Sequence, residues 1–263
     1  MTTPDDIPPE QRARAANRRA WNEISARYQA DHGAGDLDVH YGPWAAPDAE
    51  LQLLGKVQGC RVLDVGCGGG QNCIALARRK AIVTGLDLSD AQLEAAANHA
   101  AVAGVAVTFV HGTPEDLSGF AAQCFDLILS VQTMHYVPDA PRALAEFHRV
   151  LNPAGRLVIS LDHPMRDCFF NLEEQSQEIY PVRGYFDEQP MRWRWPDSRA
   201  WLTSYHRTIA DWVTLFAQSG FVLRRLLEPT VPADRLDAWW PVDDAMSSMR
   251  HLPHGVIFVA GKE

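Results

Sequence analysis

The chain has 263 residues, 46% of them hydrophobic, and a formal net charge of -9. This length is enough to bury one large hydrophobic core without a division into separate domains. The acidic charge argues against a nucleic-acid partner, because affinity for a phosphate backbone depends on clustered lysine and arginine. A small molecule is therefore the favoured partner.

The five cysteines show no C-x-x-C spacing, so the sequence indicates neither a metal site nor a disulfide framework. We expect reduced thiols and a cytoplasmic location. The first 19 residues are polar and charged, unlike a signal peptide, and no apolar run reaches the roughly 18 residues of a membrane span. We therefore expect no export and no membrane segment.

Residues 20–28 predict an amphipathic helix. Trp21, Ile24 and Tyr28 recur at the spacing that places them on one face. A turn with Tyr41 follows, and we expect residues 1–54 to form a helical cover on the remaining domain, residues 55–263. Tyr28 and Tyr41 are candidate ligand contacts because a phenol offers both a π face and a hydroxyl. The alternative is a helix that only completes the core.

A glycine-rich turn follows the first predicted strand. Apolar residues 62–65 lead into a cluster at 66–70, and residues 71–80 predict a helix. Open α/β sheets bind ligands at the carboxyl ends of their strands, and glycine lets the backbone approach a ligand closely. A dinucleotide fingerprint requires glycine at the sixth position, where this chain has Gln71.

Strands and helices continue to alternate along the chain, which predicts a parallel sheet. Helices are expected from Ser89, from residues 138–139 to about 151, and over 209–219. The last two strands have no long helix between them and could pair antiparallel. The strands expected after the first are 82–86, 106–110, 125–131, 155–161, 221–227 and 256–260.

Three segments carry a resemblance to a known family. Asp64 with the glycine cluster resembles the first motif of class I S-adenosylmethionine-dependent methyltransferases, and residues 83–89 resemble the second. Residues 125–131 are similar to the motif of the fourth strand. The resemblance, of the methyltransferase type 11 kind, implies a Rossmann-like seven-stranded α/β sheet, mostly parallel with an antiparallel C-terminal hairpin and helices on both faces. It implies S-adenosylmethionine as cofactor and a small-molecule methyl acceptor.

The resemblance also implies which residues bind the cofactor. The acidic residue of the second motif, here Asp87, accepts hydrogen bonds from the ribose hydroxyls, and Leu88 packs on the adenine. Thr113 stands where relatives carry an acidic residue for the adenine amino group, so the backbone of its neighbours can share that contact. The other implied contacts are Tyr28, Asp64, Gly66, Cys67, Gly68, Gly70, Pro114, Glu115 and Ser130.

Three histidines are candidate general bases, because a histidine that titrates near neutrality can accept the proton of a phenol or hydroxyl. His135 and His163 follow the fourth and fifth strands, on the ligand side of the sheet, and His206 begins the helix before the sixth. We favour His163, because Asp162 and Pro164 indicate a fixed loop. The alternative for each is a role in capping or packing.

Residues 164–206 form an insertion too long for an ordinary connection, with interleaved aromatic and arginine residues. We expect a lid over a planar or anionic small molecule, with Tyr185, Arg192 and Trp195 as contacts. A structural cap without ligand contact is the alternative.

Two other functions remain open. A non-catalytic sensor of S-adenosylmethionine or S-adenosylhomocysteine would bind the same ligand, and turnover separates it from an enzyme. A nicotinamide-dependent oxidoreductase is disfavoured by Gln71. We expect a monomer or a homodimer.

Overall fold

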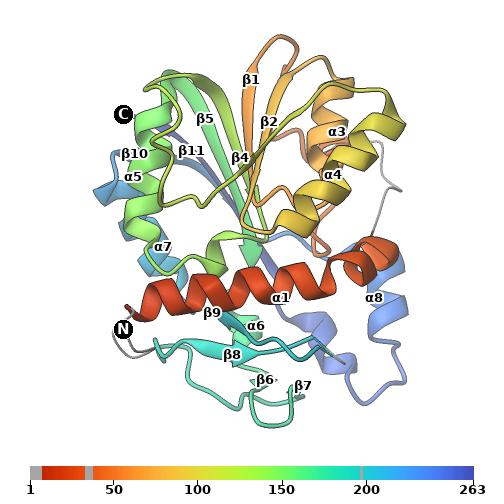
Figure 1. Ribbon diagram of the computed structural model, residues 1–263. Helices are drawn as coiled ribbons and strands as arrows, with labels where there is room; N and C mark the ends of the chain where they lie inside the picture. The colour runs from red at the N-terminus through yellow and green to blue at the C-terminus, as the bar shows by residue number, and fades with distance from the viewer. Residues whose placement is uncertain (1–7, 33–37, 196–197) are drawn as a thin grey trace, which may run out of the picture.

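The computed structural model describes residues 8–32, 38–195 and 198–263, and a mixed sheet forms its centre (Figure 1). The strand order across this sheet is β3-β2-β1-β4-β5-β11-β10. Its strands within the described ranges are β1 (Arg61–Val65), β2 (Ile82–Asp87), β3 (Thr108–His111), β4 (Phe125–Val131), β5 (Leu151–Asp162), β10 (Phe221–Leu227) and β11 (Gly255–Lys262).

The pairing confirms a mostly parallel sheet with an antiparallel C-terminal hairpin. Strands β1 to β5 pair parallel with their neighbours, whereas β11 runs antiparallel to both β5 and β10. The carboxyl ends of the parallel strands therefore meet at one edge, where the turns after β1, β2, β4 and β5 come together.

Helices cover both faces of the sheet and enclose two hydrophobic clusters. Along β1, Leu63 packs in one cluster and Val62 in the other, as the two-residue period of a strand requires. The first cluster includes residues of α5 (Ala140–Val150) and α7 (Ile209–Gln218), and the second includes residues of α3 (Gln71–Arg78). Outside these clusters, α4 (Asp90–Ala103) contacts β2 and β3.

Local sequence signals explain how these elements begin. The Ser89 side chain accepts a hydrogen bond from the Gln92 amide at 3.2 Å and caps α4 as expected. Asp139 caps α5 in the same way, through the Arg142 amide at 3.0 Å. The fifth strand begins at Leu151 rather than at residue 155, so the expected turn before it belongs to the strand.

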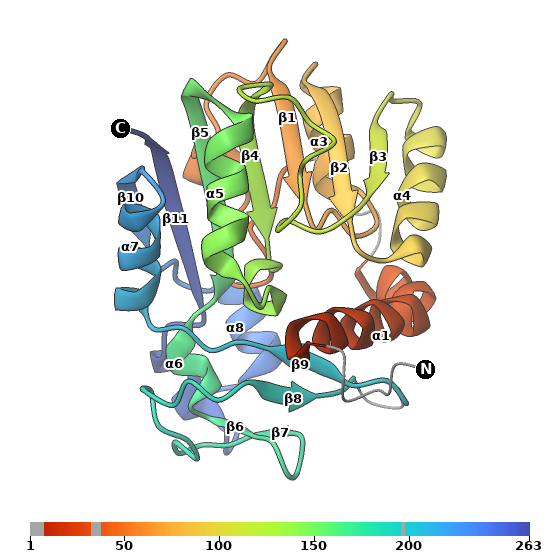
Figure 2. The same ribbon diagram turned by 60° about the vertical axis from the view of Figure 1, so that its left-hand side comes forward.

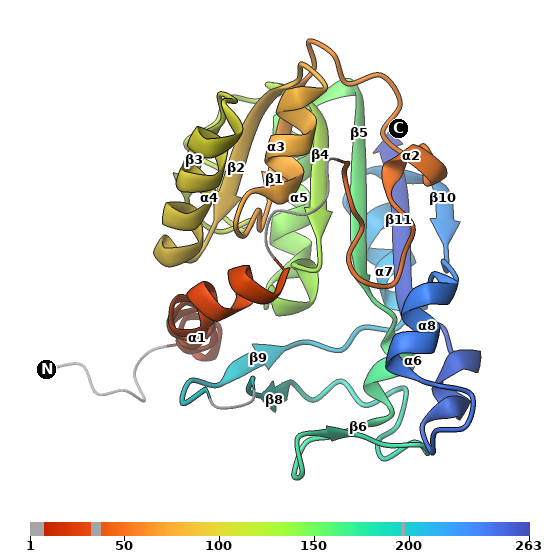
Figure 3. The same cartoon turned by 90° about the vertical axis from the view of Figure 1, so that its right-hand side faces the viewer.

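The carboxyl edge of the sheet is covered by the N-terminal helix and the insertion. Helix α1 (Pro9–His32) lies across this edge beside the β8–β9 hairpin, as Figures 2 and 3 show. Asn17 joins the two elements, because its side chain exchanges two hydrogen bonds with the Thr203 backbone, at 3.0 and 2.7 Å. The insertion contains α6 (Pro164–Asp167), β6 (Phe170–Asn171), β7 (Ser176–Gln177), β8 (Met191–Trp193) and β9 (Leu202–Ser204).

The remaining elements are short. They are α2 (Asp48–Leu51), α8 (Ala233–Trp239) and the 3-10 helices η2 (Met134–Tyr136) and η3 (Ser247–His251). In the described ranges no helix has the length and apolar character needed to cross a bilayer.

Candidate functional site

A cavity of about 700 Å³ lies at the carboxyl edge of the sheet. Its walls come from the turns after β1, β2, β4 and β5, from α1, and from the insertion. This volume lies within the usual range for small-molecule sites. The fold thus brings segments distant in sequence around one cavity.

The glycine turn after β1 forms part of the cavity wall. Gly66, Gly68 and Gly70 have φ values of +71°, +52° and +79°, which L residues rarely adopt. A Cβ added at Gly66 would lie 2.0 Å from the Thr133 hydroxyl oxygen, whereas one added at Gly68 would meet no atom within 4 Å. Gly68 therefore faces open space that a ligand can fill, and Gly66 is required by close packing.

Asp87 lies at the end of β2 and also lines the cavity. Its carboxylate accepts hydrogen bonds from the amides of Gly68 at 2.9 Å and Ser89 at 2.8 Å. Burial raises the pKa of this carboxyl, and those two amide bonds oppose the rise. Because each carboxylate oxygen has a second lone pair, Asp87 can still accept two hydrogen bonds from a ligand.

Asp64 is the penultimate residue of β1, just before the glycine turn, and its side chain is buried. Burial raises its pKa to about 7, although the Cys73 thiol donates a hydrogen bond to it at 3.2 Å. Both Asp64 and Cys67 reach the cavity wall. Asp64 can therefore accept or donate a hydrogen bond near neutral pH.

The turn after β3 closes the cavity beside Asp87. Thr113, Pro114 and Glu115 line the cavity here. The Glu115 carboxylate forms an ion pair with Arg14 of α1 at 3.1 Å. Glu115 thereby docks the N-terminal helix at this end of the cavity.

Comparisons with known proteins agree with this geometry. Residues 63–159 match the family described as "Methyltransferase domain". A protein of Haemophilus influenzae is 30% identical over 189 residues, which cover 68% of this chain and 74% of that protein. The solved S-adenosylmethionine-dependent methyltransferase of Mesorhizobium loti is 26% identical with a TM-score of 0.66, over 81% of this chain and 96% of that one.

The chain belongs to the class I S-adenosylmethionine-dependent methyltransferase family.

The named relatives match over a shorter range. The ubiquinone biosynthesis O-methyltransferase of Saccharophagus degradans is 33% identical over 140 residues, which cover 53% of this chain and 56% of that enzyme. The chain thus spans little more than half the length of such curated relatives.

The residues of this methyltransferase fold fit S-adenosylmethionine, the methyl donor of the family. The open face of Gly68 leaves room for a ligand against the backbone, and Asp87 offers a carboxylate beside it. Of the contacts that the sequence predicts for the cofactor, Gly70 and Ser130 do not line the cavity. Gly70 caps α3, where a Cβ would lie 3.0 Å from Ala96, and Ser130 is fully buried within the sheet.

Tyr28 and Trp195 reach the cavity from the two covering segments. Their rings meet edge to face with centroids 5.8 Å apart, and Tyr28 makes a similar contact with Trp21 at 5.4 Å. Burial raises the pKa of Tyr28, so its phenol is neutral at physiological pH. Helix α1 and the insertion thus meet through aromatic contacts over the cavity.

His163 does not line the cavity, which contradicts its predicted role as the general base. Its Nδ1 accepts a hydrogen bond from the Met165 amide at 3.0 Å and caps α6. Nε2 therefore carries the proton and donates to Glu228 at 2.8 Å. With both ring nitrogens occupied and the side chain buried, His163 fastens α6 to the strand end at Glu228.

We expect His163→Ala to lower stability by about 1–2 kcal/mol, the usual range for a lost helix cap, or roughly 2–8 °C in Tm. Thermal unfolding followed by circular dichroism measures this. His163→Asn is the matched control, because its side-chain oxygen can replace the Nδ1 cap. An unchanged Tm combined with a large loss of turnover at saturating acceptor would contradict the structural role.

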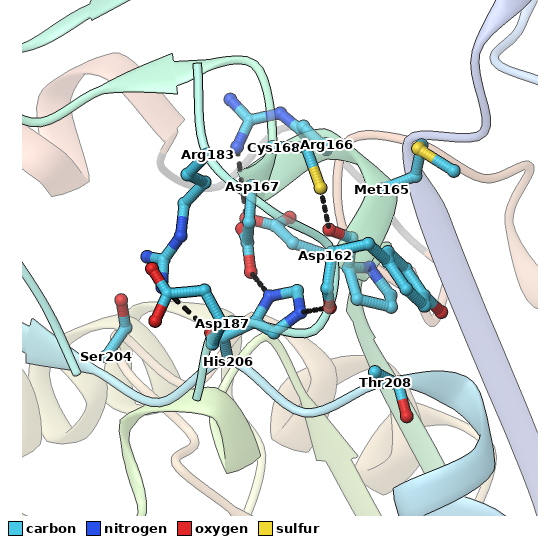
Figure 4. A network of polar contacts seen from close by, with 12 residues as sticks. Asp162, Met165, Arg166, Asp167, Cys168, Arg183, Asp187, Ser204, His206 and Thr208 are labelled. Atoms are coloured by element: carbon cyan, nitrogen blue, oxygen red, sulfur yellow. Dashed lines mark hydrogen bonds and ion pairs between the residues drawn. The ribbon is translucent and has the colours of Figure 1, made fainter. Parts of the chain in front are cut away.

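His206 is also a structural residue rather than a base in the cavity. Figure 4 shows its ring beside Asp167, whose carboxylate lies 2.9 Å from Nδ1. Nε2 lies 2.7 Å from the carbonyl of Tyr185, which can only accept. Burial alone would lower the pKa of His206, but the hydrogen bond and charge of Asp167 outweigh it and raise the pKa. The charged imidazole therefore donates from both nitrogens and joins α6 to later segments of the same insertion.

This ion pair predicts a pH-dependent contribution to stability. The pKa of His206 is raised above the ordinary 6.5, so its contribution is fully present below pH 6.5 and is lost as the pH rises through the folded-state pKa. The Tm difference between wild type and His206→Gln should be largest below pH 6.5 and should narrow above it. Thermal unfolding across pH 5 to 9, roughly the range over which histidine titrates, measures it. A difference that does not change with pH would contradict a charged His206.

His135, in η2 after β4, is the predicted base that does line the cavity. Its ring lies against Tyr136 with centroids 4.1 Å apart, and Nδ1 is buried without a hydrogen-bond partner among the described residues. Burial lowers the pKa of His135 below the ordinary 6.5, so the ring is neutral at pH 7. A neutral imidazole beside a ligand space can accept a proton.

Three predicted acceptor contacts lie outside the cavity, which corrects the sequence analysis. Tyr41 is buried in the core, where its hydroxyl donates to Asp48 at 2.5 Å and its pKa is raised by burial. The Tyr185 hydroxyl accepts a hydrogen bond from the Ile209 amide at 3.2 Å. Arg192 is exposed, and its guanidinium lies over the Trp201 ring.

Several cavity residues were not predicted from the sequence. One signal was present in β8, where Met191 and Trp193 alternate with the exposed Arg192, so the two share the inner side. The other missed residues come from separate segments and only the fold brings them together; they include Arg14, Asn17, Trp44, Gln132, Tyr136, Asp162, Arg166, Tyr205, Arg207 and Trp239.

Proposed function

We propose that this protein transfers a methyl group from S-adenosylmethionine to a hydroxyl of a small molecule. The observation that carries the proposal is the open face of Gly68 beside the Asp87 carboxylate, in the wall of a cavity that His135 also lines. Both the donor and an acceptor can therefore occupy one cavity.

The cofactor side of the cavity is the edge formed by β1, β2 and β3. Asp87 would accept the ribose hydroxyls, and Leu88 and Thr113 would face the adenine. Gly66, Cys67 and Gly68 would lie against the methionine part above Asp64, and Tyr28 would offer its ring to the sulfonium. Pro114 and Glu115 complete this wall. The bound cofactor supplies an activated methyl group, so the protein need only place the acceptor and exclude water.

The acceptor side is formed by η2 and the covering segments, α1 and residues 164–206. Aromatic side chains dominate this wall, among them Trp21, Tyr136, Trp193 and Trp195, which suits a planar acceptor. His135 would accept the proton of the attacking hydroxyl, because its neutral ring faces this space. The O-methyltransferase name of the curated relatives supports oxygen over nitrogen or carbon as the attacking atom.

The test is methyl transfer from radiolabelled S-adenosylmethionine to a panel of phenols and other hydroxyl compounds, together with calorimetry of S-adenosylhomocysteine. Transfer to at least one acceptor with saturable binding supports the proposal. Tight binding of S-adenosylhomocysteine without transfer to any acceptor supports the sensor instead. Cofactor-fluorescence titration with NADH tests the oxidoreductase, which predicts a saturable signal.

The state of the cysteines supports a reducing compartment, such as the cytoplasm. All five cysteines are free thiols, and Cys67, Cys73 and Cys168 are buried. Light scattering distinguishes the monomer from the homodimer that we propose as alternatives.

A further inference from the structure

Arg207 lies between β9 and α7 and lines the acceptor side of the cavity. Its Nη2 donates to the carbonyls of Val137 and Pro138, at 2.9 and 3.0 Å. Its Nη1 is buried and has no hydrogen-bond partner among the described residues. Two carbonyl contacts therefore fix the guanidinium in place, while the two N–H donors of Nη1 have no acceptor.

The charge of Arg207 also lacks a partner within the part of the chain that the structure describes. No carboxylate there lies within 4.0 Å of its guanidinium. Two other arginines of the cavity differ, because Arg14 pairs with Glu115 at 3.1 Å and Arg166 with Asp162 at 3.4 Å. Arg207 is thus a fixed cation in the wall without a direct counter-charge.

Two aromatic rings lie next to this cation, and its guanidinium is largely removed from water. The guanidinium carbon lies 5.5 Å from the ring centroids of both Tyr205 and Trp212. Burial lowers the pKa of Arg207 to about 10, so the side chain is still charged at neutral pH. A partly desolvated cation with unpaired donors is unfavourable, and an anion that enters the cavity beside it would relieve this.

We propose that Arg207 binds a carboxylate of the methyl acceptor, so that the substrates of this protein are small hydroxy acids. That this ligand is a methyl acceptor rests on the proposed function. That it carries a negative charge rests on the geometry of Arg207.

A single negative charge fits this place better than a phosphate monoester, which carries nearly two. The reason is that acidic groups surround the cation at longer range, namely Asp211, Asp139 and Glu115. One carboxylate would balance the charge of Arg207, whereas a dianion would add to the existing negative charge.

Arg207 and His135, the proposed base, line the same part of the cavity. The amide of Tyr205 donates to the carbonyl of His135 at 2.7 Å, and the two carbonyls that hold Arg207 belong to the residues two and three positions after His135. The positive charge of Arg207 also acts on His135, where it adds to the pKa lowering by burial. A carboxylate at Arg207 would therefore orient a hydroxyl of the same small molecule toward His135.

The experiment measures binding rather than turnover. Protein saturated with S-adenosylhomocysteine is titrated by calorimetry with matched pairs of hydroxybenzoates and hydroxybenzamides, including the 2-hydroxy, 4-hydroxy and 3,4-dihydroxy compounds. We expect at least one acid to bind about 10- to 100-fold more tightly than its amide, the range of one charge-assisted contact. Arg207→Gln should remove this preference, and Arg207→Lys should restore part of it.

Arg192→Gln is the matched control, because Arg192 belongs to the same insertion region but is exposed and lies outside the cavity. It should keep the preference for the acid, and all three variants should bind S-adenosylhomocysteine within about 2-fold of wild type, less than the loss of one hydrogen bond. Equal affinity for every acid and its amide in wild type, or an intact preference in Arg207→Gln, overturns the proposal. Analogues that carry a phosphate in place of the carboxylate are titrated in the same way. Tighter binding of these dianions than of the acids would also overturn the proposal. A clear preference for acids without methyl transfer would contradict the proposed function but not the anion site.

Discussion

His135→Ala is expected to lower turnover by about 10²- to 10⁴-fold, the usual contribution of a positioned general base. The reason is that the neutral His135 ring lines the acceptor side of the cavity, and no described residue occupies its Nδ1. The affinity for S-adenosylhomocysteine should change little, since Asp87 and the glycine turn form a different wall. Steady-state kinetics with an acceptor from the panel, together with calorimetry, measures both quantities.

The pH profile separates a base from a packing residue. The pKa of His135 is lowered by burial below 6.5, so wild-type turnover should fall only when the pH drops below that value, where the ring becomes protonated. His135→Ala should lose this acidic limb. His163→Ala is the matched control and should keep the limb and most of its rate, because His163 caps α6 outside the cavity. A folded His135→Ala enzyme with near-normal turnover would contradict the role of His135 as general base. Catalysis would then depend only on how the protein positions the acceptor and the methyl donor.

Asp87→Ala is expected to weaken the binding of S-adenosylhomocysteine by about 10- to 100-fold. The substitution would leave two ribose hydroxyls without their charged acceptor, which costs about 1.5–3 kcal/mol. It also removes the carboxylate that holds the amides of Gly68 and Ser89, so the glycine turn loses part of its support. Isothermal titration calorimetry gives the affinity, and thermal unfolding shows that the variant is folded.

Two glycine variants separate loss of the ligand from loss of the fold. Gly68→Val should abolish binding, because the new side chain enters open space that the cofactor would fill, and the positive φ of this position should lower the Tm without any steric collision. Gly66→Ala should instead lower the Tm, because its Cβ would collide with Thr133. Normal binding in both Asp87→Ala and Gly68→Val would place the cofactor elsewhere in the cavity.

The sheet was predictable because its signals are local. Strand β4 (Phe125–Val131) is a continuous apolar run and strand β10 (Phe221–Leu227) follows a helix that stops before a glycine, so both have the predicted bounds. Ser89 caps α4 through a contact only three residues away. Periodicity, caps and turn residues act within a few positions, and the sequence displays them directly.

The acceptor side was harder to predict because loops place its side chains. His163 and His135 both follow strands at the same edge, yet one points to Glu228 and the other to the cavity. Tyr41 was predicted to contact a ligand because it lies in a turn, but its hydroxyl donates a hydrogen bond to Asp48 in the core. The direction of a loop side chain depends on which distant groups pack around it, and no local pattern records that.

The sequence by itself determined the doubly wound sheet and the position of the glycine turn, since a strand that ends in glycines before a helix places that turn at the carboxyl edge of the sheet. It also marked Asp87, whose place at the end of β2 follows from the same alternation. Only the tertiary structure decided which histidine reaches the cavity and that Arg207 lies in its wall without an ion-pair partner among the described residues. Those features depend on α1, η2 and the insertion closing over one edge, and contacts between residues so distant in sequence form only when the chain is folded.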